Sequence, residues 1–253
     1  MEETFIHSTL LSAVSGVTHG FSTRYGGVSK GPYASLNLAH HVDDKPDHVE
    51  VNSARALSAL EVVDKQLIRL EQVHGASLVR ITQESANQVL SADGCWSEDS
   101  DFVLCIMVAD CLPILLTDRE GSFVAAVHAG WRGTADRIIV NMIDTLMATG
   151  REAKNLKVAL GPSIGPCCFE IDALVAEKLR ASAPGGLGLN IGLESGKYLA
   201  NLWEINMQQL LACGVPSEGI DVVRECTKCS KKYYSYRRDR GITGRQAGLI
   251  GFS

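Results

Sequence analysis

The chain has 253 residues, enough for one large domain or two small ones. Its 45% hydrophobic and 21% charged residues are typical of a globular protein, and no apolar run approaches the ~20 residues that a membrane helix needs. A net charge of -5 disfavours a broad polyanion-binding surface, so we expect small-molecule substrates and neither a nucleic-acid nor a membrane partner.

The N-terminal segment and the cysteines indicate the compartment. Residues 1–20 carry acidic side chains where a secretory signal carries positive charge, and polar residues interrupt their apolar content. The 8 cysteines are irregularly spaced, as expected for reduced thiols rather than for a disulfide framework. We therefore expect a cytoplasmic, disulfide-free protein, and we expect it to be a monomer.

Short apolar or alternating segments bounded by turn residues predict strands, and segments with helical periodicity lie between them. In chain order we expect a helix over 48–62, strands over 65–70, 77–82, 102–110, 113–118 and 123–130, a helix over 135–150, a strand over 156–161, a helix over 199–214 and a strand over 220–223. No repeat or Pro/Ser-rich linker divides the chain, so residues 1–253 are interpreted as one domain. Several strands adjoin without an intervening helix, which favours a mixed-sheet α/β or α+β domain over a simple βαβ repeat.

Three of these segments end in a residue that could bind a metal. "EQVHG" delivers His74, "VADCLP" delivers Cys111 and "AVHAGWRG" delivers His128, each where a strand-like segment runs into a turn. A His/His/Cys set with one open position is the arrangement of a catalytic zinc site. Spacing alone leaves a second interpretation open, in which the three are packed core residues.

Four other sequence motifs are weaker indicators of function. "GPSIG" places Ser163 in a nucleophile-elbow pattern, but every histidine precedes it, so the hydrolase order of Ser, Asp and His is not available. The "CTKC" at 226–229 has no second pair at zinc-ribbon spacing, which favours structural thiols. The glycine-rich segment 185–192 is expected to be a flexible loop, and "KKYYSYRR" at 231–238 a half-buried strand.

Eight motifs, in order over nearly the whole chain, carry a resemblance to a known family: "FSTRYGGVS", "SLNLAHHV", "QVHG", "ADGCW", "ADCLPILL", "VHAGWRG", "GPSIGPCCFE" and "YYSYRRDRGITGRQAGLI". The sequence resembles the laccase-domain family, whose members were first called multicopper polyphenol oxidases and are now assigned purine nucleoside phosphorylase, methylthioadenosine phosphorylase and adenosine deaminase activities. The resemblance implies that His74, Cys111 and His128 hold the metal. It also implies a layered α/β/β/α domain like that of a deamidating bacterial toxin. Cys95 departs from the family's usual Leu or Ala and receives no role.

The expected metal is Zn²⁺, with Cu²⁺ as the alternative. A divalent ion held by a thiolate and two imidazoles acidifies bound water toward neutrality, and a nearby carboxylate could move protons, for which Asp93 and Asp110 are candidates. Arg24 and Arg132 are candidate phosphate clamps because a guanidinium binds phosphate oxygens in a bidentate way. Two simpler interpretations remain open, in which Arg24 is a surface arginine in a Gly-rich turn and Asp110 forms a turn.

The resemblance implies a metal-dependent purine nucleoside enzyme. Its reactions would be phosphorolysis of adenosine, inosine, guanosine and methylthioadenosine, and hydrolytic deamination of adenosine to inosine. One alternative is a Cys-His hydrolase acting on amides of peptidoglycan precursors, with Cys111 as nucleophile and His128 as base. Another is a copper-dependent polyphenol oxidase, although the paired H-x-H clusters of a true laccase are absent from the sequence. The last alternative is a protein that binds a metal ion without catalysing a reaction.

Overall fold

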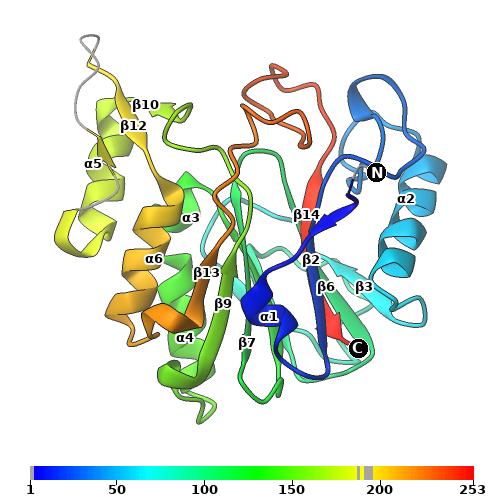
Figure 1. Ribbon diagram of the computed structural model, residues 1–253, viewed down its shortest axis with the longest axis horizontal. Coiled ribbons are helices and arrows are strands. Elements are labelled where there is room, and N and C mark those ends of the chain that lie inside the picture. Colours follow the sequence, from blue (N-terminus) through cyan, green and yellow to red (C-terminus); the bar gives the residue numbers. More distant parts are fainter. Residues whose placement is uncertain (1–2, 187–188, 191–195) are drawn as a thin grey trace.

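Two mixed β-sheets form the centre of the computed structural model, which describes residues 3–186, 189–190 and 196–253 (Figure 1). The first sheet has the order β1 (Phe5–Ile6), β2 (Val17–Ser22), β14 (Gln246–Phe252), β6 (Phe102–Val108) and β3 (Gln66–Arg69). The second has the order β13 (Ile220–Val222), β9 (Leu156–Leu160), β7 (Leu112–Asp118), β8 (Val124–Ala129), β5 (Gly94–Ser97) and β4 (Leu78–Arg80). Each sheet combines parallel with antiparallel pairs, which confirms the expected mixed-sheet fold.

The two sheets pack face to face. Leu104 and Ile106 of β6 and Ile250 of β14 meet Val124 and Ala126 of β8 in one fully buried cluster. These strands are apolar on both faces, as expected for strands covered on both sides. Removing a buried leucine such as Leu104 would leave a cavity costing about 2–5 kcal/mol.

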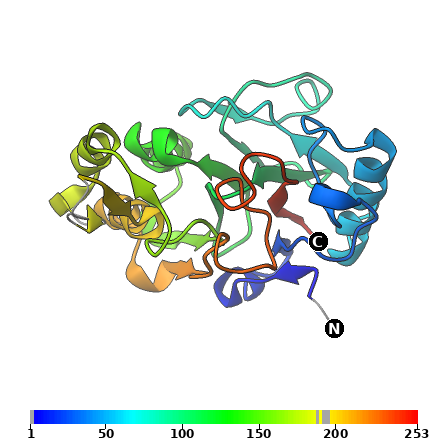
Figure 2. The same cartoon turned by 90° about the horizontal axis from the view of Figure 1, so that it is seen from above.

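Helices cover the outer faces of the sheets, on opposite sides of the molecule (Figure 2). Helix α2 (Pro46–Ala59) packs Ala56 against the first sheet, in a cluster with Val103 and Leu249. The second sheet is covered by α3 (Trp131–Ala135), α4 (Ile138–Met147) and α6 (Leu202–Ala212), and α5 (Ala173–Ser182) packs outside them against α3 (Figure 1). The layers are therefore α/β/β/α, as the resemblance implied.

The remaining elements are short. Helix α1 (Thr9–Ser12) precedes β2, and a small third sheet has the order β10 (Glu170–Ile171), β12 (Tyr198–Ala200) and β11 (Leu189–Asn190). In the described ranges no helix combines the length and the apolar character that crossing a membrane requires.

The three predicted helices are confirmed, with ends set by local chemistry. Pro46 occupies the first turn of α2, where its missing N–H costs nothing. The Asn201 side chain accepts the Glu204 N–H and caps α6. Gly214 follows the end of α6 with φ 86°, a conformation that glycine adopts without strain.

The prediction of a strand over 231–238 is wrong. This segment is a series of turns, because polar groups satisfy its backbone in place of a neighbouring strand. The Arg238 guanidinium donates to the carbonyls of Thr227, Ser230 and Tyr233 at 2.7–3.0 Å. Of the glycine-rich segment 185–192, residues 187–188 and 191–192 lie outside the described residues.

A buried histidine lies on β2, away from the predicted metal ligands. Nε2 of His19 accepts the Ser8 N–H at 2.9 Å, and the Ser8 hydroxyl donates to Asp221. The His7 ring stands edge-on to His19, with centroids 5.6 Å apart. Burial, reinforced by His7 and opposed by Asp221, lowers the pKa of His19 to about 4. His19 is therefore neutral in the folded protein near pH 7.

Candidate functional site

The structure brings together the three residues that the sequence proposed as metal ligands. His74 follows β3, Cys111 follows the turn between β6 and β7, and His128 lies near the end of β8. Their donor atoms all lie within 4.8 Å of one another, and the two imidazole rings are 4.8 Å apart between centroids at an interplanar angle of 71°. Residues 37 and 17 positions apart in the chain thus form one compact donor set.

Gly130 lies directly against this donor set. A Cβ atom at this position would lie 3.0 Å from Cys111 Sγ and 3.6 Å from His74 Nδ1. A contact of 3.0 Å is tight for a carbon, so a side chain here would push Cys111 Sγ by a few tenths of an ångström. The glycine of "HAGW" therefore lets the backbone lie close to the donor set.

Asp93, at the start of β5, supports the ligands from behind. Its side chain is fully buried, and Oδ1 accepts the His74 backbone N–H at 2.9 Å and lies 2.8 Å from His128 Nδ1. Oδ2 accepts the Gly75 N–H at 2.6 Å. With Nδ1–H directed at Asp93, His128 keeps the Nε2 lone pair for a metal, the usual way in which a carboxylate fixes the tautomer of a metal-binding imidazole. Asp93 thus holds both histidines, and it is absent from the cavity wall described below.

The charges of these groups depend on one another. Burial acts to raise the pKa of Cys111, but His128 and His74 outweigh it and lower this pKa to about 6. Burial acts to lower the pKa of His128, but the Cys111 thiolate and Asp93 raise it to about 9. The pKa of Asp93 falls despite burial, because His128 and the Gly75 N–H stabilise its charge. Cys111 is therefore a thiolate near neutral pH, the form in which cysteine binds metals.

The donor set fits a divalent metal. Ligands on a tetrahedral zinc, with Zn–S about 2.3 Å and Zn–N about 2.0–2.1 Å, are roughly 3.3–3.8 Å apart, within the span found here. One thiolate and two imidazoles suit zinc and also copper, so the ligand types alone do not distinguish the two ions.

His74, Cys111 and His128, the three candidate ligands, face a cavity of about 920 Å³ at the ends of β3, β6 and β8. This is within the range of about 300–1,000 Å³ typical of small-molecule sites. Arg69, Arg132 and Arg245 line it, together with the aromatic rings of Trp131 and Tyr236. Several cations around one cavity provide a site for an anion, and the aromatic faces provide surfaces for a planar ring.

Sequence reasoning missed three of the arginines that line the cavity, which are Arg69, Arg237 and Arg245. Arg69 is the last residue of β3, and its Nε is buried without a hydrogen-bond partner within the described part of the chain. Arg245 precedes β14, and burial lowers its pKa. The motif "TGRQ" could have indicated Arg245, whereas a single arginine at the end of an apolar strand carries no such signal.

The other predicted residues divide between the cavity and its surroundings. Arg132 lines the cavity, stacked 4.4 Å from the Trp131 ring. Arg24 is not part of the lining, because its Nε donates to the Ala34 carbonyl at 2.7 Å and its guanidinium lies 4.7 Å from the Tyr234 ring. The geometry thus agrees with the simpler interpretation of Arg24 and gives it no position as a phosphate clamp in this cavity.

Asp110 borders the cavity but uses its carboxylate to hold a loop. The carboxylate accepts the Thr227 hydroxyl at 2.6 Å, the Ser235 hydroxyl at 3.0 Å and the Arg237 N–H at 2.7 Å. Asp110 has φ 89°, a left-handed conformation that side chains rarely adopt and that is often found at functional sites. These contacts agree with the turn-forming interpretation of Asp110.

Comparison with known proteins agrees with the fold and the motifs. The family model described as "Multi-copper polyphenol oxidoreductase laccase" matches residues 18–253. The chain is 38% identical over 248 residues to purine nucleoside phosphorylase YlmD of Geobacillus stearothermophilus, covering 94% of this chain and 90% of that protein. It is 39% identical over 236 residues to purine nucleoside phosphorylase YfiH of Escherichia coli (strain K12), covering 93% of each.

A solved structure extends the comparison to three dimensions. The crystal structure of YlmD from Geobacillus stearothermophilus superposes with a TM-score of 0.91 at 34% identity, covering 99% of both chains. Sequence and structure agree over nearly the full length, and the chain therefore belongs to the multi-copper polyphenol oxidoreductase laccase family.

Proposed function

We propose that this chain is a metal-dependent purine nucleoside phosphorylase that also deaminates adenosine. The observation that carries the proposal is the cavity, in which the His74, Cys111 and His128 donor set faces a wall containing four arginines. Two relatives sharing more than a third of its residues are named purine nucleoside phosphorylases, which supports the same substrate class. Adenosine, inosine, guanosine and methylthioadenosine are the proposed substrates.

In phosphorolysis the arginines bind and orient the attacking group. Arg69, Arg132 and Arg245 hold inorganic phosphate, so that one of its oxygens attacks the anomeric carbon of the ribose. The bond from that carbon to the purine nitrogen breaks, and the base leaves with a proton. The rings of Trp131 and Tyr236 offer faces against which the purine can stack.

Deamination uses the other electrophilic carbon of the same substrate. When bound, the metal acts as a Lewis acid and lowers the pKa of water at the site. Asp93 keeps His128 and His74 in position, so its part in this reaction is to orient ligands. Water adds at C6 of adenosine and ammonia leaves, giving inosine.

The decisive experiment follows the fate of adenosine. Metal-loaded protein is incubated with adenosine, with and without phosphate, and the products are separated. Adenine and ribose 1-phosphate that form only with phosphate support phosphorolysis, and inosine in both samples supports deamination. If neither reaction occurs with any of the four nucleosides, the proposal is refuted.

A charge-removing variant tests the anion site. Arg69→Met should raise the KM for phosphate about tenfold or more, because one charge-assisted contact is worth about 1.5–3 kcal/mol. Arg119→Met is the matched control, since Arg119 is exposed and pairs with Glu120 at the surface, outside the cavity. Equal phosphate KM values in the two variants would remove Arg69 from the proposed site.

One observation favours a second candidate, a Cys-His hydrolase. The lowered pKa of Cys111 and the raised pKa of His128 describe a thiolate and imidazolium pair, which is also the resting state of a cysteine nucleophile. This enzyme would cleave amide substrates, and alkylation of Cys111 would abolish cleavage in metal-free protein. Nucleoside turnover that requires metal and is lost with chelator favours the phosphorylase.

A further inference from the structure

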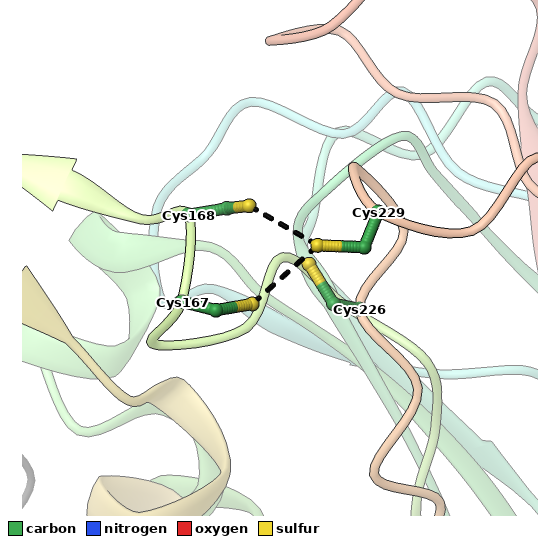
Figure 3. Close-up of side chains that lie close together, drawn as sticks. All are labelled: Cys167, Cys168, Cys226 and Cys229. Atoms are coloured by element: carbon green, nitrogen blue, oxygen red, sulfur yellow. Dashed lines mark hydrogen bonds between the residues drawn. The ribbon is translucent and has the colours of Figure 1, made fainter.

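A second group of metal-type ligands lies outside the cavity. Cys226 and Cys229 come from the loop after β13, and Cys167 and Cys168 come from the segment before β10 (Figure 3). The "CTKC" cysteines therefore lie beside a second cysteine pair, which does not stand at zinc-ribbon spacing in the sequence. The second pair comes from an adjacent Cys-Cys, 58 residues earlier, and no fixed spacing in the sequence connects the two pairs.

The four sulfur atoms converge on one point. Cys229 Sγ lies 3.6 Å from Cys167 Sγ and 3.4 Å from Cys168 Sγ, and all four sulfurs lie within 4.8 Å of one another. A tetrahedral zinc with Zn–S about 2.3 Å places its sulfurs about 3.8 Å apart. In two disulfides each sulfur would have one close neighbour at about 2.05 Å, whereas Cys229 is nearly equidistant from two sulfurs.

The backbone around the sulfurs supports a bound thiolate. The Gly165 N–H donates to Cys226 Sγ at 3.2 Å, and the N–H groups of Lys228 and Cys229 also act on this sulfur. Ligating thiolates are commonly stabilised by such contacts. Cys167 and Cys229 are exposed, which leaves a route for an ion from solvent.

We propose that Cys167, Cys168, Cys226 and Cys229 bind one zinc ion as a tetrathiolate structural site. Four thiolates close the coordination shell, so no position is left for substrate. The short separations leave no room for inorganic sulfide between the cysteines, which favours a single ion over an iron–sulfur cluster. Zinc displaces the thiol protons to solvent on binding, and no change of oxidation state is involved.

The site joins two segments that form a wall of the cavity. Ile164 and Phe169 flank the first cysteine pair and line the cavity, and Tyr236 and Arg237 do so from the loop that carries the second pair. The two segments are already adjacent, because the Thr227 N–H donates to the Ser163 carbonyl at 3.0 Å. Zinc would add to this hydrogen bond a cross-link between two segments that are about 60 residues apart in the chain.

Metal analysis of the full chain tests the proposal. Protein purified with zinc and without chelator should hold about two equivalents of zinc. The double variant Cys167→Ser/Cys229→Ser should hold about one equivalent, because it loses the four-cysteine site. Cys111→Ser should also hold about one equivalent, because it loses the cavity site. Cys213→Ser is the control and should keep both, since Cys213 ends α6 and belongs to neither group. A control variant that loses as much zinc as the double variant would overturn the assignment.

A measurement on the unmodified protein covers the case in which the double variant does not fold. Alkylation of Cys167 and Cys229, followed by mass spectrometry, should be at least about tenfold slower in zinc-loaded protein than after chelation. Equal rates, a mapped disulfide among the four cysteines, or bound iron in place of zinc would each overturn the proposal. The result does not depend on nucleoside turnover, so it stands apart from the proposed function.

Discussion

Asp93→Asn should weaken metal binding at the cavity without closing the cavity. All three neighbours of the Asp93 carboxylate can serve as donors: the N–H groups of His74 and Gly75, and Nδ1–H of His128. An asparagine can point its one oxygen at the two groups that now share Oδ1, but its NH₂ then faces the Gly75 N–H. Two opposed donors leave a buried group unsatisfied, which costs about 1–3 kcal/mol.

Removing the negative charge of Asp93 lowers the stability of the variant further. The contact to His128 becomes a neutral hydrogen bond, roughly half as strong, so the free energy of unfolding should fall by about 2–4 kcal/mol in all. Metal affinity should fall about 10–100-fold, because His128 is no longer fixed in one tautomer. Chelator competition and urea unfolding measure the two effects.

The matched control is a buried aspartate at a distance from the site. Asp118 accepts the N–H and the hydroxyl of Ser122 at the end of β7, so Asp118→Asn should lower stability and leave metal affinity unchanged. If Asp93→Asn binds metal as tightly as the unmodified protein while losing stability, Asp93 does not position the ligands.

Three further changes test the site and the fold. Cys111→Ser should lose most of the metal of the cavity site, measured by elemental analysis, and full retention would contradict its role as a ligand. Gly130→Ala should lower metal affinity about tenfold, because its Cβ would lie 3.0 Å from Cys111 Sγ, whereas a Cβ at Gly75 meets nothing closer than 3.6 Å and Gly75→Ala should be tolerated. His19 has a folded pKa of about 4 against 6.5 when unfolded, so protonation favours the unfolded chain and stability falls as pH drops from about 6.5 to 4. At pH 5 the loss is about 2 kcal/mol, and His19→Gln should reduce the pH dependence of urea unfolding by that amount; an unchanged dependence would disprove the assignment.

The parts of the fold that the sequence predicted are those in which local pattern and tertiary burial agree. Residues 102–109 and 123–127 are apolar throughout because both faces of β6 and β8 are covered. The segment 231–238 has the aromatic alternation of a strand, yet it forms turns. Its backbone partners include the side chains of Asp110, Gln246 and Arg238, and these contacts leave no periodic signal in the sequence.

The site also contains residues that could be predicted from the sequence and residues that could not. His74, Cys111 and His128 could be grouped because each stands at the end of a strand-like segment, and strand ends in paired sheets meet. Arg69 could not be found in this way, since its position facing the cavity depends on the pairing of β3 with β6. Arg24 stood out because of its Gly-rich motif, but that motif shapes a turn that directs the guanidinium elsewhere.

The cysteine group was missed for a topological reason. Metal-site patterns are recognised by short spacings, and here the two pairs are separated by α5, the third sheet and α6. The parallel bridge between Ser163 and Cys226 and the hydrogen bond from the Gly165 N–H to Cys226 Sγ bring them together.

The turn at Asp110 links the surroundings of the two proposed metal sites. Its carboxylate holds Thr227, which lies between the cysteines of the second group, and its neighbour Cys111 belongs to the cavity. Thermodynamic linkage makes any such coupling reciprocal. If zinc at the four cysteines tightens metal binding at the cavity by some factor, metal in the cavity tightens zinc binding at the cysteines by the same factor. Couplings of about 1–3 kcal/mol are typical between sites, so the chelator concentration that empties one site should depend on whether the other site is filled.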